Sequence, residues 1–340
     1  MKLAPYSIFA ATLAAAGLPI YIHAPKFYVD EFGVGLAALG GVLFALRLID
    51  VIQDPFFGWL SRRTAQARAA AVAVAGGVMS LSMIALFAVA PPIAPLAWFA
   101  ITLALLFSSF SFLTITFYAQ GVRKAARLGE EGHVRLAAWR ETGALLGISL
   151  ASVAPVAMEP ITDAPFAVFA GAFAVITALA VWSMRGEWIT GDRIETVSFG
   201  PVLRDATARR LLLIALLNAT PVAVTSTLFL FFVETRLAAP GWEGPLLLLF
   251  FLAAAASAPL WGRYAETVGA KRALLTGMVL AIISFAGAAF LGAGDTWAFA
   301  LICLASGAAL GADMTLLPAI FARRLEAIVP EAAEGFGLWS

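Results

Sequence analysis

The chain has 340 residues, of which 62% are hydrophobic and 13% charged, and its mean hydropathy is +0.93. Soluble globular domains carry about 25% charged residues, so this composition excludes an ordinary soluble enzyme and indicates a protein of the lipid bilayer. The net charge of +1 gives no basis for nucleic-acid binding, and the single cysteine, Cys303, cannot form an internal disulfide.

Apolar runs between charge clusters predict ten membrane-spanning helices, because about 20 apolar residues cross the hydrocarbon core. In chain order the expected spans are 4–27, 35–60, 69–90, 96–121, 136–158, 165–184, 211–234, 244–262, 273–292 and 297–321. These spans predict an all-α polytopic membrane protein.

Basic residues gather in alternate loops between these spans. Of the 22 lysines and arginines, 18 lie on one side, whereas the opposite loops carry only Lys26 and Arg236. Loops rich in lysine and arginine stay cytoplasmic. The pattern therefore predicts a multi-pass protein of the cell (inner) membrane with its N-terminus in the cytoplasm.

A repeated pattern divides the chain into two halves. The run from Pro55 to Gly58 matches the run from Pro259 to Gly262 at an offset of 204 residues, and Arg123-Lys124 and Trp139 match Arg323-Arg324 and Trp339 at an offset of 200. We expect a six-helix bundle over 1–184, a cytoplasmic linker over 185–210 and an incomplete second bundle over 211–340. The repeat also predicts that residues 335–340 begin an eleventh helix and that the natural chain continues past Ser340 with two more spans.

The second span carries three ionisable side chains, Arg47, Asp50 and Asp54. Their spacing places them within about 100° of one helix face. An ionisable group in hydrocarbon costs several kcal/mol, so such residues usually serve a function or pair with one another. Two carboxylates at i and i+4 form a site for Na⁺ or H⁺, and the alternative is a fixed salt-bridge network in which Arg47 neutralises the acids.

Two later spans also carry charges. Arg140 and Glu141 lie at the start of the fifth span, with directions about 100° apart on the helix. We interpret Arg140 as a donor aimed into the cavity, toward substrate hydroxyls or Asp50; the alternative is that it reaches outward to lipid head groups. Asp313, in the tenth span, is either a second coupling carboxylate or a partner for an arginine.

The run from Arg47 to Thr64 resembles the signature R-x-x-D-x-x-x-D-P-x-x-G-x-x-x-[DS]-R-T of the glycoside–pentoside–hexuronide:cation symporters, whose best-known member is melibiose permease. Trp139-Arg140-Glu141, Gly311-Ala312-Asp313 and the terminal run 336–340 are also similar to patterns of that family. It belongs to the major facilitator superfamily, so the resemblance implies the major facilitator fold, with ten of an expected twelve helices present and a C-terminal truncation.

The resemblance also implies roles for individual residues. It assigns the coupling cation to Asp50, Asp54 and Ser111. The residues expected to bind substrate are Arg140, Tyr118, Thr114, Arg47 and Asp313, and those expected in a gating loop are Gly58, Arg62 and Arg63. The sugar-binding aspartate of the first helix falls on Ala14, and the aspartate and tryptophan of the fourth helix of melibiose permease fall on Thr114 and Tyr118. These departures weaken the case for galactoside recognition and leave the cation site intact.

These observations favour a secondary active transporter that carries a sugar or glycoside with Na⁺ or H⁺ by alternating access, rather than an enzyme. Two alternatives are a transporter of the same fold for lipids or other organic solutes, and a transporter-like fragment that no longer transports. A third, from another class, is an intramembrane prenyl-type transferase with a D-x-x-x-D magnesium site at Asp50 and Asp54, although no second acidic pair accompanies it. We expect no cofactor beyond the coupling ion and a monomer whose partners are a small-molecule substrate and the bilayer.

Overall fold

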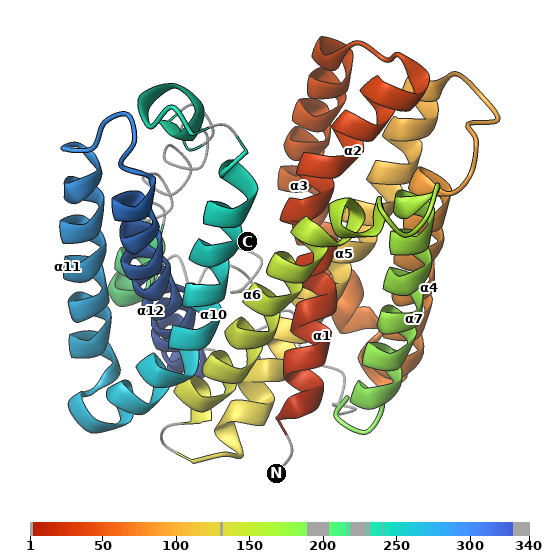
Figure 1. Ribbon diagram of the computed structural model, residues 1–340. Coiled ribbons are helices and arrows are strands. Elements are labelled where there is room, and N and C mark those ends of the chain that lie inside the picture. Colours follow the sequence, from red (N-terminus) through yellow and green to blue (C-terminus); the bar gives the residue numbers. More distant parts are fainter. Residues whose placement is uncertain are drawn as a thin grey trace.

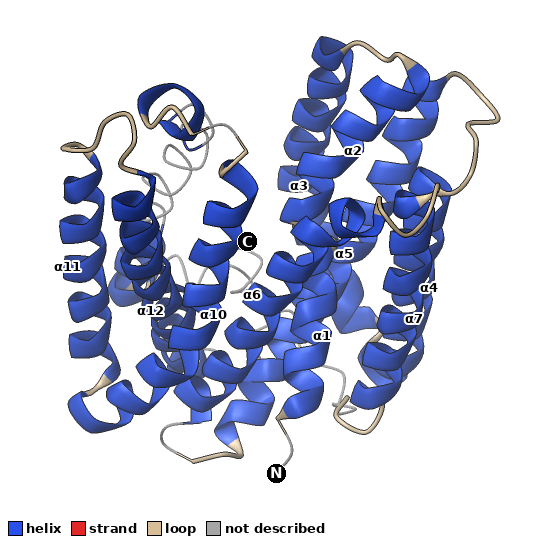
Figure 2. Ribbon diagram, viewed as in Figure 1, coloured by secondary structure: helices blue, strands red, loops and turns tan. Residues whose placement is uncertain are grey.

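In the computed structural model the described residues are 3–129, 132–188, 204–215, 217, 229, 232–239 and 241–328. These residues are almost all helical, and no strand occurs among them (Figure 2). Figure 1 shows the helices as two groups side by side, one from the N-terminal part of the chain and one from the C-terminal part. We call them the N-terminal and C-terminal groups.

The N-terminal group contains seven helices and one short 3₁₀ turn at Ala65–Ala67. The helices are α1 (Ala4–Ala15), α2 (Leu18–Phe32), α3 (Leu36–Arg63), α4 (Arg68–Phe87), α5 (Pro95–Ala126), α6 (Gly132–Met158) and α7 (Pro165–Met184).

In the C-terminal group the described helices are α10 (Glu243–Val268), α11 (Ala270–Ala288) and α12 (Thr296–Ile328), with a short π-helix at Phe232–Arg236. Residues 206–215 form a helical segment that precedes them. The predicted span 211–234 and the predicted start of an eleventh helix at 335–340 fall largely or wholly outside the described residues.

The first predicted span is the one that differs most from the structure. It was expected as one helix over 4–27, but α1 ends at Ala15 and α2 begins at Leu18. Gly17 lies between them with φ −90° and ψ −113°, which is not helical. Pro19 stands in the first turn of α2, where its missing N–H has no helical partner to lose, so the break is placed where proline is best tolerated.

Six helices in the described residues are long and apolar enough to cross a membrane, and α3 makes a seventh if its two bent parts count as one span. The two parts of α3, Leu36–Asp50 and Gln53–Arg63, meet at an angle of 52°. Pro55 follows the bend, and a proline ring clashes with the carbonyl four residues before it, here at Val51. The bend therefore falls between Asp50 and Asp54.

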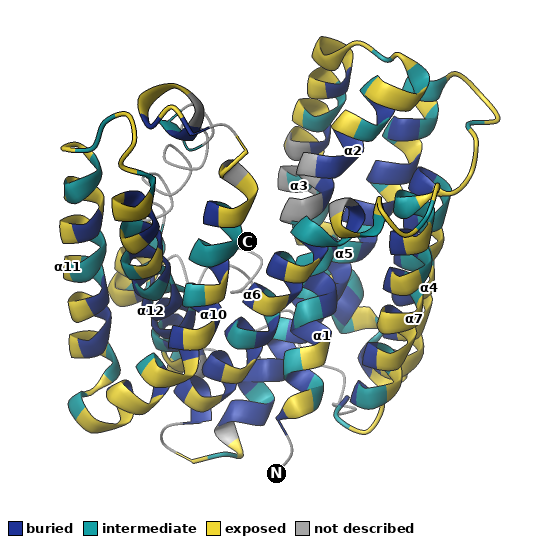
Figure 3. Cartoon of the chain, in the orientation of Figure 1, coloured by how far each residue is buried: buried dark blue, intermediate teal, exposed yellow. Residues whose placement is uncertain are grey.

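Large apolar side chains cover the outer faces of both groups. Leu150 of α6 is 70% exposed, and Val74 of α4 and Ile282 of α11 are similarly exposed. Figure 3 shows such exposed residues running along the outward sides of α4, α7 and α11, while the inner faces are buried. This inverted pattern suits a molecule whose solvent is hydrocarbon.

The two groups meet through α6, which packs against α10 and α12. Val134 and Ala137, in the first turns of α6, share a buried cluster with Leu316 of α12, and Leu145 packs against Ala254 of α10. These contacts lie toward the end of the molecule where α1 begins, which we call the N-terminal side. Figure 1 shows the groups diverging toward the other end.

Candidate coupling and substrate site

A polar network joins α3 to α5 in the middle of the N-terminal group. Gln53 Nε2 donates to Asp50 Oδ1 over 2.6 Å, and Ser108 Oγ donates to Gln53 Oε1 over 2.9 Å. One turn further along each helix, Ser111 Oγ donates to Asp54 Oδ1. Both aspartates are half-buried. The network therefore gathers two carboxylates and a hydroxyl at the bend of α3.

Oxygen atoms of this kind are the ligands that hard cations prefer. Asp50 and Asp54 supply carboxylate oxygens, and Ser111 supplies a hydroxyl that can turn its lone pairs to a cation once its hydrogen bond to Asp54 is exchanged. Gln53, held by Ser108, orients Asp50. The arrangement can accept a monovalent cation between the carboxylates or a proton on one of them.

A second polar group lies where α5 meets α6. The Arg140 side chain is buried, with its Cζ 4.1 Å from the centre of the Tyr118 ring and its Nε donating to Glu141 Oε1 over 2.7 Å. Its Nη2 is buried and has no hydrogen-bond partner among the described residues. The alternative in which Arg140 reaches lipid head groups is therefore wrong, because the guanidinium points inward.

Glu141 lies closer to Arg140 than the helix geometry suggested. The two positions diverge by about 100° around α6, yet their side chains bend together into an ion pair that is almost fully buried. A buried guanidinium without a counter-charge is costly, and pairing with its neighbour removes most of that cost. Glu141 thus neutralises the Arg140 guanidinium through Nε and leaves its Nη2 able to donate hydrogen bonds to a substrate.

The face of α5 between the aspartate cluster and the Arg140 cluster is also polar. Ser111, Thr114 and Tyr118 follow one another at i, i+3 and i+7, which places them on one stripe of the helix about 10 Å long. Thr114 Oγ1 is buried and finds no hydrogen-bond partner in the described part of the chain. The stripe runs from the side chain that contacts Asp54 to the side chain that contacts Arg140.

Two further residues, Arg47 and Asp313, are expected to bind substrate. Arg47 is in α3, but its side chain is not among those described. Asp313 lies half-buried in α12, about one turn from Pro318, which shares a narrow space with Tyr118 and Arg140. The substrate-binding roles expected for Arg47 and Asp313 stay predictions.

The three residues expected in a gating loop lie instead within the last turns of α3. Gly58 is buried, Arg62 is half-buried, and Arg63 is exposed with its Cζ 4.7 Å from the centre of the Trp59 ring. Their gating role stays a prediction.

The chain matches the MFS/sugar transport protein family over residues 6–328, nearly its whole length. The chain belongs to this family. It is therefore a multi-pass membrane protein of the major facilitator superfamily and a secondary transporter, not an enzyme, and the transferase interpretation of Asp50 and Asp54 does not hold.

A solved structure supports the fold. The crystal structure of a bacterial homologue of the iron transporter ferroportin, in an outward-facing state, superposes with a TM-score of 0.71 over 99% of this chain and 88% of that chain. The sequences are 15% identical, so the likeness concerns the fold alone. No curated protein matches the sequence.

Sequence reasoning missed several members of the transporter's polar network. Gln53 and Ser108 complete the chain from Asp50 to α5, and near the N-terminal side Thr116 Oγ1 donates to Ser61 Oγ over 2.8 Å. Gln53 carried a usable signal, because it is a polar residue three positions after Asp50 on the same face.

Ion pairs attach the two ends of the segment after α7 to the helix groups, one end to the N-terminal group and the other to the C-terminal group. Lys124, near the end of α5, forms an ion pair with Glu187, and Gln120 Nε2 donates to the Glu187 carbonyl oxygen over 2.6 Å. At the far end of the same segment, Arg324 of α12 pairs with Asp205. Lys124 and Arg324 occupy equivalent positions at the offset of 200 residues.

Proposed function

We propose that this transporter is a cation-coupled symporter of the glycoside–pentoside–hexuronide type, with a sugar or glycoside as substrate and Na⁺ or H⁺ as the coupling ion. The observation that carries the proposal is the α5 stripe of Ser111, Thr114 and Tyr118. It connects the side chain that holds Asp54 with the side chain that stacks on Arg140. One rigid helix face thus serves a cation site and a substrate site.

The physical basis for coupling is the cost of charge in the membrane. With no cation bound, Asp50 and Asp54 repel each other at the bend of α3, and binding a cation relieves that repulsion and draws α3 toward α5. A movement of α5 at Ser111 is transmitted along the helix to Tyr118. The cation therefore favours the arrangement of Tyr118 and Arg140 in which substrate binds.

The substrate class rests on the chemistry of Arg140. Its planar fork is buried and neutralised by Glu141, and its Nη2 has donors to spare. A sugar offers hydroxyl acceptors without a charge of its own, which fits a site whose own charges already balance. Thr114 adds a hydroxyl on the same face.

The test is uptake into proteoliposomes with an inward Na⁺ gradient, an inward proton gradient or neither. The panel contains labelled glycosides, pentosides and hexuronides, together with a lysophospholipid that represents the alternative lipid substrate. Asp50→Asn and Asp54→Asn should abolish gradient-driven uptake and leave some exchange, because the substrate site remains. Asp163→Asn, in the exposed loop before α7, is the matched control and should behave as wild type.

Gradient-driven uptake that survives in both aspartate variants would contradict the coupling site. Uptake of the lysophospholipid alone would retain the coupling site and replace the substrate class. Ion-gradient independence of the wild-type protein would overturn symport itself.

We propose further that the N-terminal side faces the cytoplasm, because the loops predicted on that side are rich in lysine and arginine. Cys303 is buried, so the wild-type chain gives little background in thiol labelling. Asp163→Cys and Gly186→Cys lie in exposed loops at opposite ends of α7. A membrane-impermeant thiol reagent added to intact cells should label position 163 and spare position 186, and the reverse pattern would invert the topology.

A further inference from the structure

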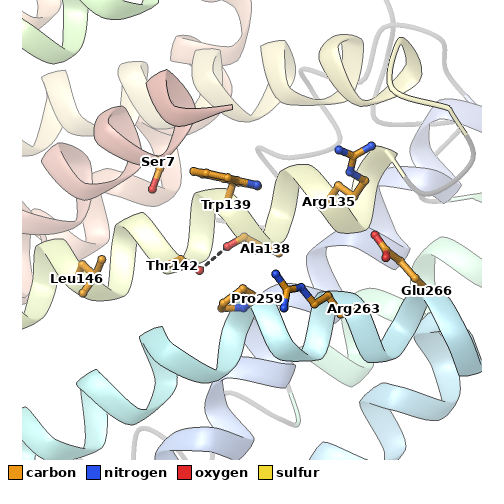
Figure 4. Close-up of a pocket in the computed structure, with 10 residues that line it drawn as sticks. Ser7, Arg135, Ala138, Trp139, Thr142, Leu146, Pro259, Arg263 and Glu266 are labelled. Atoms are coloured by element: carbon orange, nitrogen blue, oxygen red, sulfur yellow. Dashed lines mark hydrogen bonds between the residues drawn. The ribbon is translucent and has the colours of Figure 1, made fainter. Parts of the chain in front are cut away.

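An open cavity lies away from the coupling site. It has a volume of about 730 Å³ and is bounded by α1, α6 and α10 on one flank of the molecule (Figure 4). The residues that line it are Ser7, Arg135, Ala138, Trp139, Thr142, Leu146, Pro259, Gly262, Arg263 and Glu266. It is open along one side rather than enclosed.

This cavity opens toward the lipid. Trp139 and Leu146 are each about half exposed at its wall, and Ile8 of α1 and Leu260 of α10 are exposed beside it. These exposed apolar positions lie on α1, α6 and α10, of which α10 is long and apolar enough to cross a membrane. In a bilayer, the part of the cavity that lies beyond Trp139, away from the N-terminal side, therefore faces hydrocarbon rather than water.

The end of the cavity nearest the N-terminal side is charged. Arg135 from the first turns of α6 and Arg263 from the last turns of α10 both contribute exposed guanidinium groups, and Glu266 lies one turn after Arg263. Neither arginine has an ion-pair or hydrogen-bond partner for its side chain among the residues described. Figure 4 shows that the Arg135 and Arg263 side chains come from the two helices on either side of the cavity and that Glu266 follows Arg263 on α10.

Together these features place charged, interfacial and apolar side chains in the order of the head group, glycerol region and acyl chains of a phospholipid. Two guanidinium groups lie at the membrane boundary, an indole lies just inside them, and leucine and proline side chains lie deeper. Guanidinium groups match the geometry of phosphate oxygens, and tryptophan prefers the interface between head groups and hydrocarbon. Basic pockets between helices on the cytoplasmic side favour anionic head groups.

We propose that this cavity is a binding site for one anionic phospholipid, with its phosphate held by Arg135 and Arg263, its glycerol region beside Trp139, and an acyl chain along Leu146. The net charge of the rim, two cations against one carboxylate, selects an anionic lipid over a zwitterionic one. The site does not depend on the coupling mechanism proposed above.

The position of the site gives it a consequence for the transport cycle. Arg135 belongs to the N-terminal group and Arg263 to the C-terminal group, so one phosphate bridges the two. The helices approach closely beside the cavity, since a Cβ at Gly262 would lie 3.0 Å from the Ala138 Cβ. A lipid bound here stabilises the arrangement in which the groups touch at the N-terminal side, and it must leave or move before they separate.

The experiment measures lipid binding directly. Protein purified in mild detergent is titrated with phosphatidylglycerol or with phosphatidylcholine of the same acyl chains, and the bound lipid is counted by native mass spectrometry alongside the unfolding temperature. We expect phosphatidylglycerol to bind at one site and to raise the unfolding temperature, and phosphatidylcholine to do neither. Arg135→Gln and Arg263→Gln should each weaken binding roughly fivefold, since a basic residue near an anionic surface contributes about 1 kcal/mol.

Two further variants separate this site from general surface charge. Arg127→Gln removes an exposed arginine from the same side, outside the cavity, and should leave phosphatidylglycerol binding unchanged. Glu266→Gln removes the carboxylate from the rim and should tighten binding. A gain of affinity cannot result from misfolding, so this variant keeps the test decisive if the arginine variants fold poorly.

Several results would overturn the proposal. Equal binding by the double variant Arg135→Gln/Arg263→Gln, or an equal loss in Arg127→Gln, would show that this cavity is not the site. Equal binding of phosphatidylcholine would remove the role of charge. Equal protection by inorganic phosphate at matched ionic strength would show that the rim binds a free anion, not a lipid.

Discussion

The helix pairs α3–α5 and α10–α12 are equivalent in the internal repeat, but they are built differently. At offsets of 204 and 200 residues, Gln53 and Ser108 correspond to Ser257 and Ala308, and both pairs touch: Ser108 Oγ donates to Gln53 Oε1, and Ser257 Oγ donates to the Ala308 carbonyl oxygen over 3.0 Å. Positions that are equivalent in the repeat are therefore in contact in both groups.

The next pair of equivalent positions shows the difference. Asp54 and Ser111 form a hydrogen bond in the N-terminal group, whereas Ala258 and Gly311 occupy those positions in the C-terminal group. A Cβ at Gly311 would lie 2.6 Å from the Ala254 carbonyl oxygen, so α10 and α12 are in backbone contact. One pair of helices holds polar side chains between them, and its counterpart closes the same space with small residues.

The comparison teaches that the repeat fixes the geometry of the helices and not their chemistry. We infer that the N-terminal group senses the cation while the C-terminal group moves as a stiff body. Four substitutions test this contrast.

The largest effect should come from placing the N-terminal chemistry into the C-terminal group. Ala254, the counterpart of Asp50, is fully buried against α6 and α12. Ala254→Asp puts a carboxylate in an apolar contact, at a cost of about 3 kcal/mol or more. We expect little folded protein by size-exclusion chromatography in detergent, whereas Ala254→Ser should fold. A well-folded aspartate variant would show that the C-terminal group also accommodates a charge.

Widening the close contact should have the next largest effect. Gly311→Leu drives a side chain into the backbone of α10 and should destabilise the protein by about 2 kcal/mol, read as a lower unfolding temperature. Gly171→Leu, in α7, is the matched control because a Cβ there meets no atom within 4 Å. Equal unfolding temperatures for the two variants would mean that α10 and α12 are not held rigidly together.

Weakening the polar pair should leave the fold intact and change cation affinity. Ser111→Ala removes a hydroxyl oxygen that, in the proposed site, ligates the cation. A polar contact to a charged group contributes about 1.5 kcal/mol, so the cation concentration for half-maximal uptake should rise roughly tenfold. Ser109→Ala is the control, since Ser109 Oγ donates only to the Leu105 carbonyl oxygen in its own helix. An unchanged cation dependence in Ser111→Ala would remove Ser111 from the site.

The smallest effect concerns pH. The Arg324 guanidinium, together with the Ala208 backbone N–H, lowers the pKa of Asp205 to about 2, below the value of about 3.9 in an unfolded chain. Because the pKa is lowered, the ion pair contributes its full stability above pH 4 and loses it as the pH falls toward 2. The difference in unfolding temperature between wild type and Asp205→Asn should therefore be constant from pH 8 to 5 and shrink below pH 4. A difference that vanishes already at pH 6 would contradict this assignment.

Much of the fold was predictable because membrane spans are continuous apolar runs. The span expected at 165–184 coincides with α7, and that at 35–60 overlaps α3 except for its first residue. The break at Gly17 was missed because the residues around it are as apolar as the helices, and hydropathy does not register backbone conformation. The bend in α3 was missed for a similar reason, although Pro55 marks its position.

From the residues themselves, the candidate site was predictable only where it is charged, and Ser111, Thr114 and Tyr118 were expected through the family resemblance. Asp50, Asp54 and Arg140 stand out in apolar surroundings, whereas Ser108 resembles the many serines that bond to their own helix. The cavity rim at Arg135 and Arg263 was not predictable, because it depends on the packing of α6 against α10. A sequence does not reveal which ends of two helices that are distant in the chain lie side by side.

The two ion pairs that hold the segment after α7 have a consequence for how the polypeptide can be assembled. Lys124–Glu187 lies within the N-terminal group and Arg324–Asp205 within the C-terminal group, so neither has to break when the groups move. The 18 peptide units that join Glu187 to Asp205 can extend to about 60 Å, so the segment leaves the two groups room to move relative to one another. Since α6 packs against α10 and α12, we expect the two groups to associate without covalent continuity through this segment. The protein is therefore suited to expression as two separate polypeptides, cut within this segment, that find each other in the membrane.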